Sequence, residues 1–425
     1  MTFHETSFDL EEFSSSDAGR PSGKPDRTRP ASTQKARRSG LWFRIHGLAG
    51  LNFSLLLALI SLTGTLAVFS AEFDWLITPS MRAAAPVAAN DIAWTNIAAS
   101  LAEYAPNAEI ETIEAGETSA FAPAAYVFMS DGNRRVIRFD PVTGAVQGDH
   151  AFLGAKSLLR AIHSRLLLGN EIGPMIVSFT AFFLLASLVS ALFTYRRWWR
   201  GFLRWPKRGR SARVFWGDAH RLAGLWSIAF GFAIALTGIW YFVEDTGGRA
   251  PAFERQAFTE ADMSNREAAV RFPEALAAVR SAYPDLSIRR IDWPWHGDAG
   301  FRFYGQDGTL LVRPRANGIG VDFTTRDVAF RHSGADASMH QRIAEAADPV
   351  HMGYFAGFWS KLLWFLSGAL LTFVMASGAV IYAKRLTRET DGPIRLRNLI
   401  MTLALPMMAI GAMLALMPAT VAALS

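Results

Sequence analysis

Two histidines occupy the same place in two copies of one sequence pattern. His46 begins His-Gly-Leu-Ala-Gly-Leu, His220 begins His-Arg-Leu-Ala-Gly-Leu, and each opens a long apolar run. Seventeen residues later, each copy has the threonine of a Leu-Thr-Gly, Thr63 in the first and Thr237 in the second. Neutral imidazole is a good iron ligand, and paired histidines at the mouths of paired membrane helices are typical of haem-binding redox proteins.

A second pair of histidines follows the same repeat. His163 is followed after six residues by Gly169, His351 is followed after six by Gly357, and a further apolar run follows each. One histidine from each of two facing helices can bind the iron of a porphyrin on both faces. The sequence therefore predicts two bis-histidine sites, and filling both axial positions favours electron transfer over oxygen binding.

A single histidine at a helix end ordinarily has a structural role: it caps the helix or extends to the membrane–water interface. Repetition is what favours metal binding here. Haem also carries two propionates, which need cations or water. The predicted cations flank the paired histidines: Arg44, Arg221, Arg160, Arg165 and Lys361. Three loop histidines are the alternative external ligands: His150, His332 and His340.

The chain of 425 residues contains no cysteine. This excludes disulfides, iron–sulfur clusters and the C-x-x-C-H attachment of c-type haem. The predicted cofactors are therefore two haem b groups, each held non-covalently by two histidines. The basic residues are concentrated beside the apolar runs, so the high isoelectric point indicates membrane lipid as a partner and no nucleic acid.

Five stretches lack any Asp, Glu, Lys, Arg or His, and each reaches the roughly 20 residues that a helix needs to cross about 30 Å of hydrocarbon. We therefore predict an all-α integral membrane bundle of about five transmembrane helices with an internal duplication. The stretches are Gly47–Ala71, Ile172–Tyr195, Leu222–Val243, Leu362–Ala383 and Asn398–Ser425.

Basic residues gather in three segments, before His46, between the second and third runs, and after the fourth. The positive-inside rule places these segments in the cytoplasm. The prediction is a multi-pass protein of the bacterial inner membrane, with its amino terminus inside and its carboxyl terminus outside. The two long loops then lie in the periplasm.

The loops between the runs read as two small α+β domains, because helical spacing is followed in each by short strands around turns. The predicted organisation is a disordered cytoplasmic tail (1–39), helix 1 (40–71), a periplasmic domain (72–155), a histidine segment with helix 2 (156–195), a basic cytoplasmic loop (196–217), helix 3 (218–243), a second periplasmic domain (244–345), a histidine segment with helix 4 (346–383), a cytoplasmic loop (384–397) and helix 5 (398–423).

Several of these motifs together resemble the PepSY-associated transmembrane helix family of iron-regulated and iron-uptake membrane proteins. The resemblance covers roughly residues 40–386. The matching motifs are Ile45-His-Gly-Leu-Ala-Gly50, Asp140-Pro-Val-Thr-Gly144, Ile162-His-Ser-Arg-Leu-Leu-Leu-Gly-Asn-Glu-Ile-Gly173, Trp205-Pro206, Asp218-Ala-His-Arg-Leu-Ala-Gly-Leu-Trp226, Leu236-Thr-Gly238 and Val350-His-Met-Gly353.

The resemblance implies a siderophore-reductase-like di-haem protein with two PepSY-like periplasmic domains. It also implies one haem on His46 and His220 and the other on His163 and His351. Electrons would pass from the cytoplasmic side to a periplasmic acceptor, and the enzyme would be a haem-dependent reductase of ferric siderophore iron. Some relatives carry a fused flavin reductase domain, but no G-x-G-x-x-G follows a strand in this sequence. The electron donor is therefore expected to be a separate cytoplasmic reductase or a quinol.

Two other functions compete with this interpretation. The first is a PepSY-type binding or regulatory membrane protein without redox activity, which leaves the histidine repeat unexplained. The second is a siderophore or iron transporter, which internal duplication would suit. No charged residue lies within the apolar runs to line a transport path, so the sequence favours electron transfer.

Overall fold

The computed structural model describes residues 40–48, 53–207, 211–253, 258, 263–294 and 299–389, with 382–389 described by their backbone alone. The chain divides into two units, Met1–Leu41 and Trp42–Ser425, and the architecture below is that of the second. The predicted tail at 1–39 and the predicted helix at 398–423 lie outside the described residues.

Three helices in the described part of the chain are long and apolar enough to cross a membrane. They are α6 (Ile172–Thr194), α8 (Ile228–Val243, continued by the π-turn η4, Glu244–Gly248) and α11 (Gly357–Glu389). A fourth crossing requires that α2 (Ser54–Ala67) and α3 (Ser70–Ile77) form one broken span, since they are bent by 55°.

The prediction of an all-α bundle of about five transmembrane helices is therefore wrong. The described residues offer three candidate spans, and the helices are joined to a large antiparallel β-sheet. The predicted placement of the two termini depended on five crossings. It loses its basis because that number is not supported. Segment length is the physical reason: a break or bend divides an apolar run into pieces that are too short to span alone.

A further break lies at Ser227, between α7 (Ala212–Trp226) and α8, although the helix that begins at Ile228 is still long enough to cross a membrane. Its backbone leaves the helical region (φ −93°, ψ 2°), and its buried Oγ donates to the carbonyl of Ala223 at 2.9 Å. A serine that bonds back to the carbonyl four residues earlier often bends a helix. The predicted helix at 218–243 is consequently divided between two helices, and His220 lies on the first. In the other copy, a helix at 40–48 carries His46 and precedes α2.

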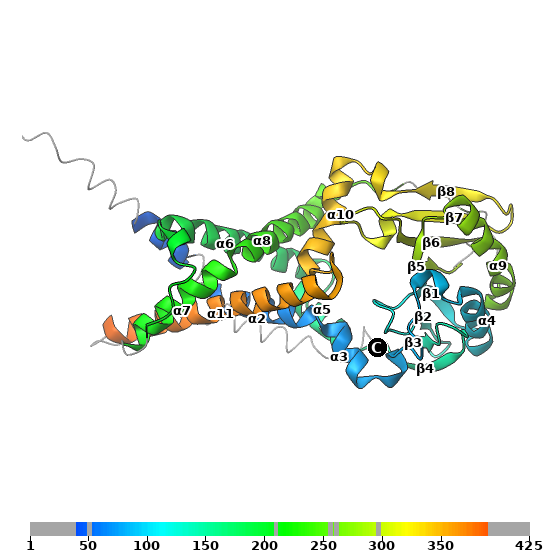
Figure 1. Cartoon of the computed structure of the whole chain (residues 1–425), viewed down its shortest axis with the longest axis horizontal. Helices are drawn as coiled ribbons and strands as arrows, with labels where there is room; N and C mark the ends of the chain where they lie inside the picture. Colours follow the sequence, from blue (N-terminus) through cyan, green and yellow to red (C-terminus); the bar gives the residue numbers. More distant parts are fainter. Residues whose placement is uncertain are drawn as a thin grey trace, which may run out of the picture. The chain divides into compact units, whose positions relative to one another are not determined.

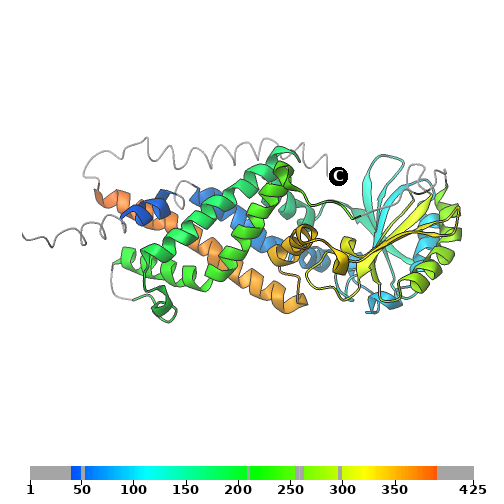
Figure 2. The ribbon, with the colours of Figure 1, turned by 90° about the horizontal axis from the view of Figure 1, so that it is seen from above.

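The membrane helices pack as neighbours, α6 against α8 and α11 against both α2 and α7 (Figure 2). Small residues allow the first of these contacts to be close. A Cβ added at Gly238 of α8 would lie 2.8 Å from Cβ of Ala181 on α6. Such approaches let backbones pack tightly where lipid gives no hydrophobic driving force. The buried centre of this helix group consists of Leu57, Leu184, Ala235, Leu371 and Met375.

The strands form a single eight-stranded antiparallel sheet in the order β4-β3-β2-β1-β5-β6-β7-β8 (Figure 1). The four strands of each half come from one of the two long loops, and the halves join where Ile113 of β1 pairs with Ile291 of β5. The two loops, which the sequence predicted to form two small α+β domains, therefore contribute four strands each to one sheet. The strands are β1 (Glu109–Glu114), β2 (Ala124–Phe128), β3 (Arg134–Phe139), β4 (Val146–Ala151), β5 (Ser287–Asp292), β6 (Gly300–Gln306), β7 (Gly318–Asp322) and β8 (Val328–His332).

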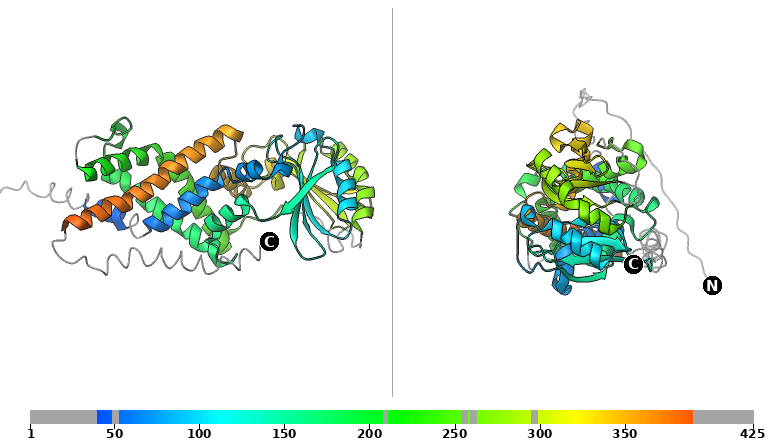
Figure 3. Two further views of the ribbon diagram at one scale, coloured as in Figure 1. Left: turned by 90° about the horizontal axis from the view of Figure 1, so that it is seen from below. Right: turned by 90° about the vertical axis from the view of Figure 1, so that its right-hand side faces the viewer.

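Helices α4 (Trp94–Tyr104) and α9 (Asn265–Ala282) pack together on one face of this sheet (Figure 3). The strands alternate, so Phe301 and Phe303 of β6 both point into that layer and are completely buried. Burying a phenylalanine side chain contributes about 1.5–3 kcal/mol. The core between the sheet and these helices is thus the main apolar cluster outside the membrane helices.

Two helices lead from the sheet to the membrane spans, α5 (Ala155–Arg165) after β4 and α10 (Met339–Met352) after β8. The buried carboxylate of Asp74 accepts the first two backbone N–H groups of α5, at 2.6 and 2.9 Å, which caps its positive end. α10 begins with a reciprocal capping box between Ser338 and Gln341. The remaining described helical turns are η1 (Pro79–Met81), η2 (Ala89–Asp91), η3 (Trp198–Arg200), η5 (Pro314–Ala316) and η6 (Gly334–Asp336).

Candidate functional site

The structure brings the four repeated histidines together as two pairs. His46, on the helix at 40–48, faces His220 on α7, with ring centroids 6.4 Å apart and ring planes at 78°. His163 on α5 faces His351 on α10, with centroids 6.0 Å apart and planes at 46°. Each pair takes one histidine from each copy of the repeat. The first pair contacts Ser187 and Ser377, in the second halves of α6 and α11, whereas the second pair lies on α5 and α10, which lead from the sheet.

The separations within the pairs suit a metal held between two imidazoles. A metal bonded to two opposed imidazole nitrogens at about 2.0 Å each would place the ring centroids roughly 6 Å apart. Both measured separations agree with this. Across the described residues, no group of three or more His, Asp or Glu gathers to bind a metal ion. A two-histidine site suits a metal whose other ligands belong to a macrocycle, as in haem.

In the first copy, the Nδ1 atoms of the histidines meet backbone carbonyl oxygens. Nδ1 of His46 lies 3.0 Å from the carbonyl oxygen of Ser187, and Nδ1 of His163 lies 2.8 Å from that of Ile60. A carbonyl oxygen can only accept a hydrogen bond, so Nδ1 must carry the proton in both rings. The lone pair of each neutral ring is therefore on Nε2.

In the second copy, the partners are hydroxyl groups. Nδ1 of His220 lies 2.9 Å from Oγ of Ser377, and Nδ1 of His351 lies 2.7 Å from Oγ1 of Thr237. Each hydroxyl has one hydrogen, and each already donates within its own helix, Ser377 to a carbonyl at 3.1 Å and Thr237 to one at 2.7 Å. The histidines must then donate through Nδ1, which again leaves the lone pair on Nε2.

All four histidines thus have the tautomer that metal ligation through Nε2 requires. Metal-ligating histidines almost always donate their other ring N–H to a carbonyl, carboxylate or similar acceptor, which fixes the tautomer and the orientation of the ring. Burial also favours the neutral form: it lowers the pKa of His163, and burial followed by the neighbouring His163 lowers the pKa of His351 to about 3. These rings are neutral at pH 7 and available as ligands.

The Leu-Thr-Gly repeat is evident in the sequence, but the sequence does not indicate its role. The structure places Thr237 of this motif against His351, while Gly64 of the first copy lies against His163. Ser377, which contacts His220, also has a counterpart in the first copy. Ser190 and Ser377 each lie five residues before a tyrosine, near the end of an apolar run. A repeat of polar or small residues inside an apolar helix was the available signal, because such a residue there usually contacts something specific.

Gly64 gives a direct test of how tightly His163 is held. A Cβ added at this position would lie 2.5 Å from Cε1 of the His163 ring, which is fixed by its bond to Ile60. We expect Gly64→Ala to displace the ring and to reduce binding of any metal group at the second pair. The measurement is the haem content of the purified variant. Gly217→Ala is the control, since a Cβ there meets nothing within 4 Å. Equal haem content in the two variants would show that the ring is not confined by Gly64.

The predicted propionate partners have different surroundings. Arg221 is paired with Asp218 on its own helix at 2.7 Å and also donates to the carbonyl of Arg204 at 3.3 Å. Arg44 and Arg160 are exposed. Arg160 precedes His163 by three residues on α5, so the two side chains share a helix face. Arg160 is therefore the predicted cation whose position relative to its histidine best suits a role beside the second pair.

The three alternative external histidines are held elsewhere. His150 on β4 accepts from Nε of Arg138 at 3.2 Å and contacts its neighbouring carbonyl through Nδ1. His332 stacks on Phe253 with centroids 4.8 Å apart. His340 contacts the carbonyl of Gly248 at 3.1 Å. Each of these three rings therefore has contacts of its own, and none of the contacts involves the paired histidines.

The comparisons with known proteins give the family of the chain. No curated protein matches the chain. The family model of the PepSY-associated TM region matches residues 43–385, a range that contains all four paired histidines and both halves of the sheet. The protein is a member of the PepSY-associated TM region family and a membrane protein of that class.

Proposed function

We propose that the protein is a di-haem b electron-transfer protein, inserted as a multi-pass protein in the bacterial inner membrane. The observation that carries the proposal is the shared state of the four histidines: each donates through Nδ1 and keeps the Nε2 lone pair, in two pairs with ring centroids 6.4 and 6.0 Å apart. A single histidine in this state would be ordinary, whereas four in two matched pairs favour two ligand sites.

When bound, haem supplies one-electron redox chemistry at its iron. The residues of this chain hold it and set its surroundings. His46 and His220 would bind one haem, and His163 and His351 the other, through Nε2. With two histidines to hold each haem, the protein would keep small molecules from the metal, which suits electron transfer. Ile60, Ser187, Thr237 and Ser377 hold the rings in place and raise their basicity as ligands.

The positions of the pairs support a direction across the membrane. Eight basic residues and no acid lie in the segment 196–213, which joins the end of α6 to α7, the helix of His220. The positive-inside rule favours the cytoplasm for that end. The other pair lies on α5 and α10, which come directly from the sheet. Electrons would therefore enter at His46 and His220 and leave at His163 and His351, towards the periplasmic sheet domain.

The family resemblance points to ferric iron in a siderophore as the acceptor, which makes the protein a haem-dependent ferric siderophore reductase. Each ferric ion takes one electron and becomes ferrous, and a donor loses the same electron on the cytoplasmic side. The donor would be a separate cytoplasmic reductase or a membrane quinol. Ferrous iron binds hard oxygen ligands less tightly than ferric iron, so reduction would release it during iron uptake.

The test is spectroscopy of the purified full-length protein in detergent, oxidised and reduced with dithionite, with haem measured against protein. We expect b-type bands from about two bis-histidine haems per chain. We also expect the reduced protein to be reoxidised by a ferric hydroxamate siderophore. Folded protein that binds no haem would contradict the proposal. Reduced haem that ferric siderophores do not oxidise would contradict only the acceptor.

A cavity of about 460 Å³ in the sheet domain favours a second candidate function. Its lining includes Glu117, Thr118 and Ser119 from the loop between β1 and β2, and Arg289 of β5. This volume falls in the range of small-molecule sites, about 300–1,000 Å³. A PepSY-type binding or regulatory membrane protein would use such a site without redox activity. The spectroscopic test separates the two candidates, because only the first requires haem.

A further inference from the structure

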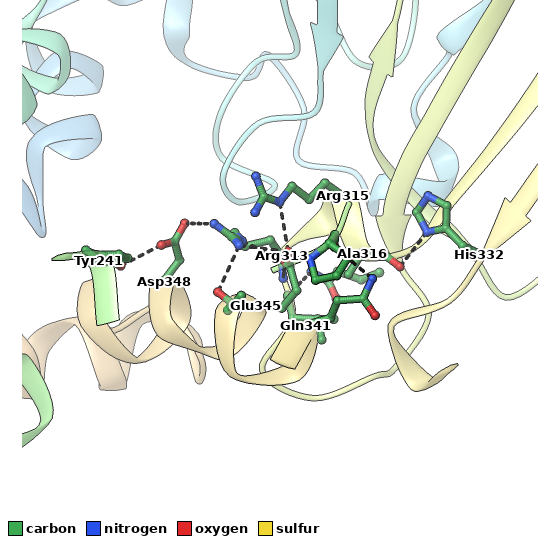
Figure 4. Close-up of polar contacts among 12 residues, drawn as sticks. Tyr241, Arg313, Arg315, Ala316, His332, Gln341, Glu345 and Asp348 are labelled. Carbon is green, nitrogen blue, oxygen red and sulfur yellow. Dashed lines mark hydrogen bonds and ion pairs between the residues drawn. The ribbon is translucent and has the colours of Figure 1, made fainter. Parts of the chain in front are cut away.

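A buried charged network connects the sheet domain to the helix that carries His351 (Figure 4). Arg313, in the segment between β6 and β7, donates to both oxygens of Glu345 at 2.8 and 2.9 Å and to Oδ2 of Asp348 at 2.9 Å. The side chains of Arg313, Glu345 and Asp348 are only 15%, 4% and 19% exposed. Bidentate pairing of this kind fixes geometry as well as contributing energy.

The network continues to the ring of His351. The other oxygen of Asp348 accepts the hydroxyl of Tyr241 at 2.7 Å. The ring of Tyr241 lies against that of His351, with centroids 5.2 Å apart and planes at 64°. Asp348 precedes His351 by three residues on α10, so both point to the same side of that helix.

Helix α8 contributes two contacts to His351 from one of its faces. Thr237 holds Nδ1, and Tyr241, one turn further along, packs on the ring. The first contact fixes which nitrogen carries the proton. The second limits rotation of the ring about its bond to Cβ, and the hydroxyl bond to Asp348 fixes the position of Tyr241 itself.

The first copy of the repeat lacks the residue types that form this network. The position that corresponds to Tyr241, four residues after the threonine of Leu-Thr-Gly, is Ala67. The position that corresponds to Asp348, three residues before the histidine, is Arg160. Duplication therefore does not explain why these groups are present, and only one ligand of the four has them.

We propose that Arg313, Asp348 and Tyr241 are positioning residues that fix the plane of the His351 ring and tie it to the sheet domain. The proposal rests on the proposed function, since it concerns a histidine that would bind the second haem. Hydrogen bonding and packing outside the ligands are among the means by which proteins tune haem. The sheet domain, where the acceptor would arrive, would then share a rigid connection with the haem that serves it.

The test compares Tyr241→Phe with Tyr283→Phe in the full-length protein. Tyr283 is a matched control, because its hydroxyl also donates to a carboxylate at 2.7 Å, that of Asp307, but within the sheet domain. The readouts are the ferric electron paramagnetic resonance signal of each haem, which depends on the angle between the two ligand planes, and the reduction potential of each haem. The double variant His163→Ala/His351→Ala identifies which signals belong to the second pair.

We expect Tyr241→Phe to shift the signal of the second haem while the first haem and the total haem content stay unchanged. Tyr283→Phe should leave both signals as in the wild type. Asp348→Asn should also shift the signal of the second haem and raise its reduction potential, because a negative charge near the oxidised haem is lost. Unchanged signals and potentials in both network variants, with haem bound, would overturn the proposal. Wild-type protein without haem would overturn the proposed function as well, so the two failures are distinguishable.

Discussion

Replacing His46 and His220 together by alanine is expected to lower the haem content from about two groups per chain to about one, with a b-type spectrum remaining from the other bis-histidine site. The two pairs are separate sites. The first uses the helix at 40–48 and α7, and the second uses α5 and α10. Haem quantification of the purified variant, together with its reduced spectrum, measures the effect.

Electron transfer should respond differently in the two double variants. The protein without His46 and His220 keeps the haem on the sheet side, so dithionite-reduced protein should still be oxidised by a ferric siderophore. Reduction through a cytoplasmic donor should be lost, because the entry site is gone. The variant His163→Ala/His351→Ala should show the reverse.

His150→Ala is the control for these variants, since His150 is held by Arg138 and by its neighbouring carbonyl, away from both pairs. We expect this variant to retain both haems. Loss of a haem in His150→Ala, or retention of both haems after removal of an entire pair, would show that the ligands are assigned wrongly.

The repeat, the predicted topology and the family resemblance together indicated which histidines would lie near one another. His46 and His220 share a motif, and the positive-inside rule placed both at the cytoplasmic face. The same logic placed His163 with His351. Membership of the family was also predictable, because its motifs are local in the sequence.

Contacts between distant segments could not be predicted in the same way. The pairing of β1 with β5 joins residues such as Ile113 and Ile291, and no local pattern specifies which sheet edges meet. The break at Ser227 depends on one hydroxyl group that bonds back to its own helix. A hydropathy pattern averages over such breaks, and it equally misses the 55° bend that divides the first apolar run into α2 and α3.

The hydrogen-bond partners of the histidines belong to the same class of unpredictable contacts. Thr237 lies 114 residues from His351, and Ser377 lies 157 residues from His220. The sequence showed that these residues recur, but only the packing of α8 against α10 and of α7 against α11 gives them partners. The burial of charged residues such as Glu345 could not be predicted either, since an isolated glutamate in a polar segment is usually exposed.

Arg313→Ala is expected to destabilise the folded protein by about 3 kcal/mol, the lower end of the range of about 3–5 kcal/mol for breaking one partner out of a buried ion pair. The cost arises because Glu345 and Asp348 stay buried after their main cation is removed. Glu345 keeps Arg315 at 3.1 Å, while Asp348 keeps the hydroxyl of Tyr241. The measurement is thermal unfolding in detergent, followed by loss of the sheet signal in circular dichroism.

Arg326→Ala provides the matched control, because it also removes an arginine from an ion pair, but at the surface. Arg326 lies 3.7 Å from Glu274, and the two side chains are 72% and 65% exposed. Exposed pairs contribute about 0–1 kcal/mol, so this variant should unfold close to the wild-type temperature. If the two variants unfold at the same temperature, the buried network does not stabilise the fold.

A second substitution separates the cost of the unpaired charge from the loss of packing. In Arg313→Ala/Glu345→Gln, the buried carboxylate is replaced by a neutral amide, which costs less to bury without a cation. We therefore expect the double variant to recover part of the stability that Arg313→Ala loses. A coupling energy of this kind is what distinguishes a charge pair from two independent contacts. If the second substitution instead adds its own full cost, Arg313 acts through packing of its side chain, and its link to α10 is not electrostatic.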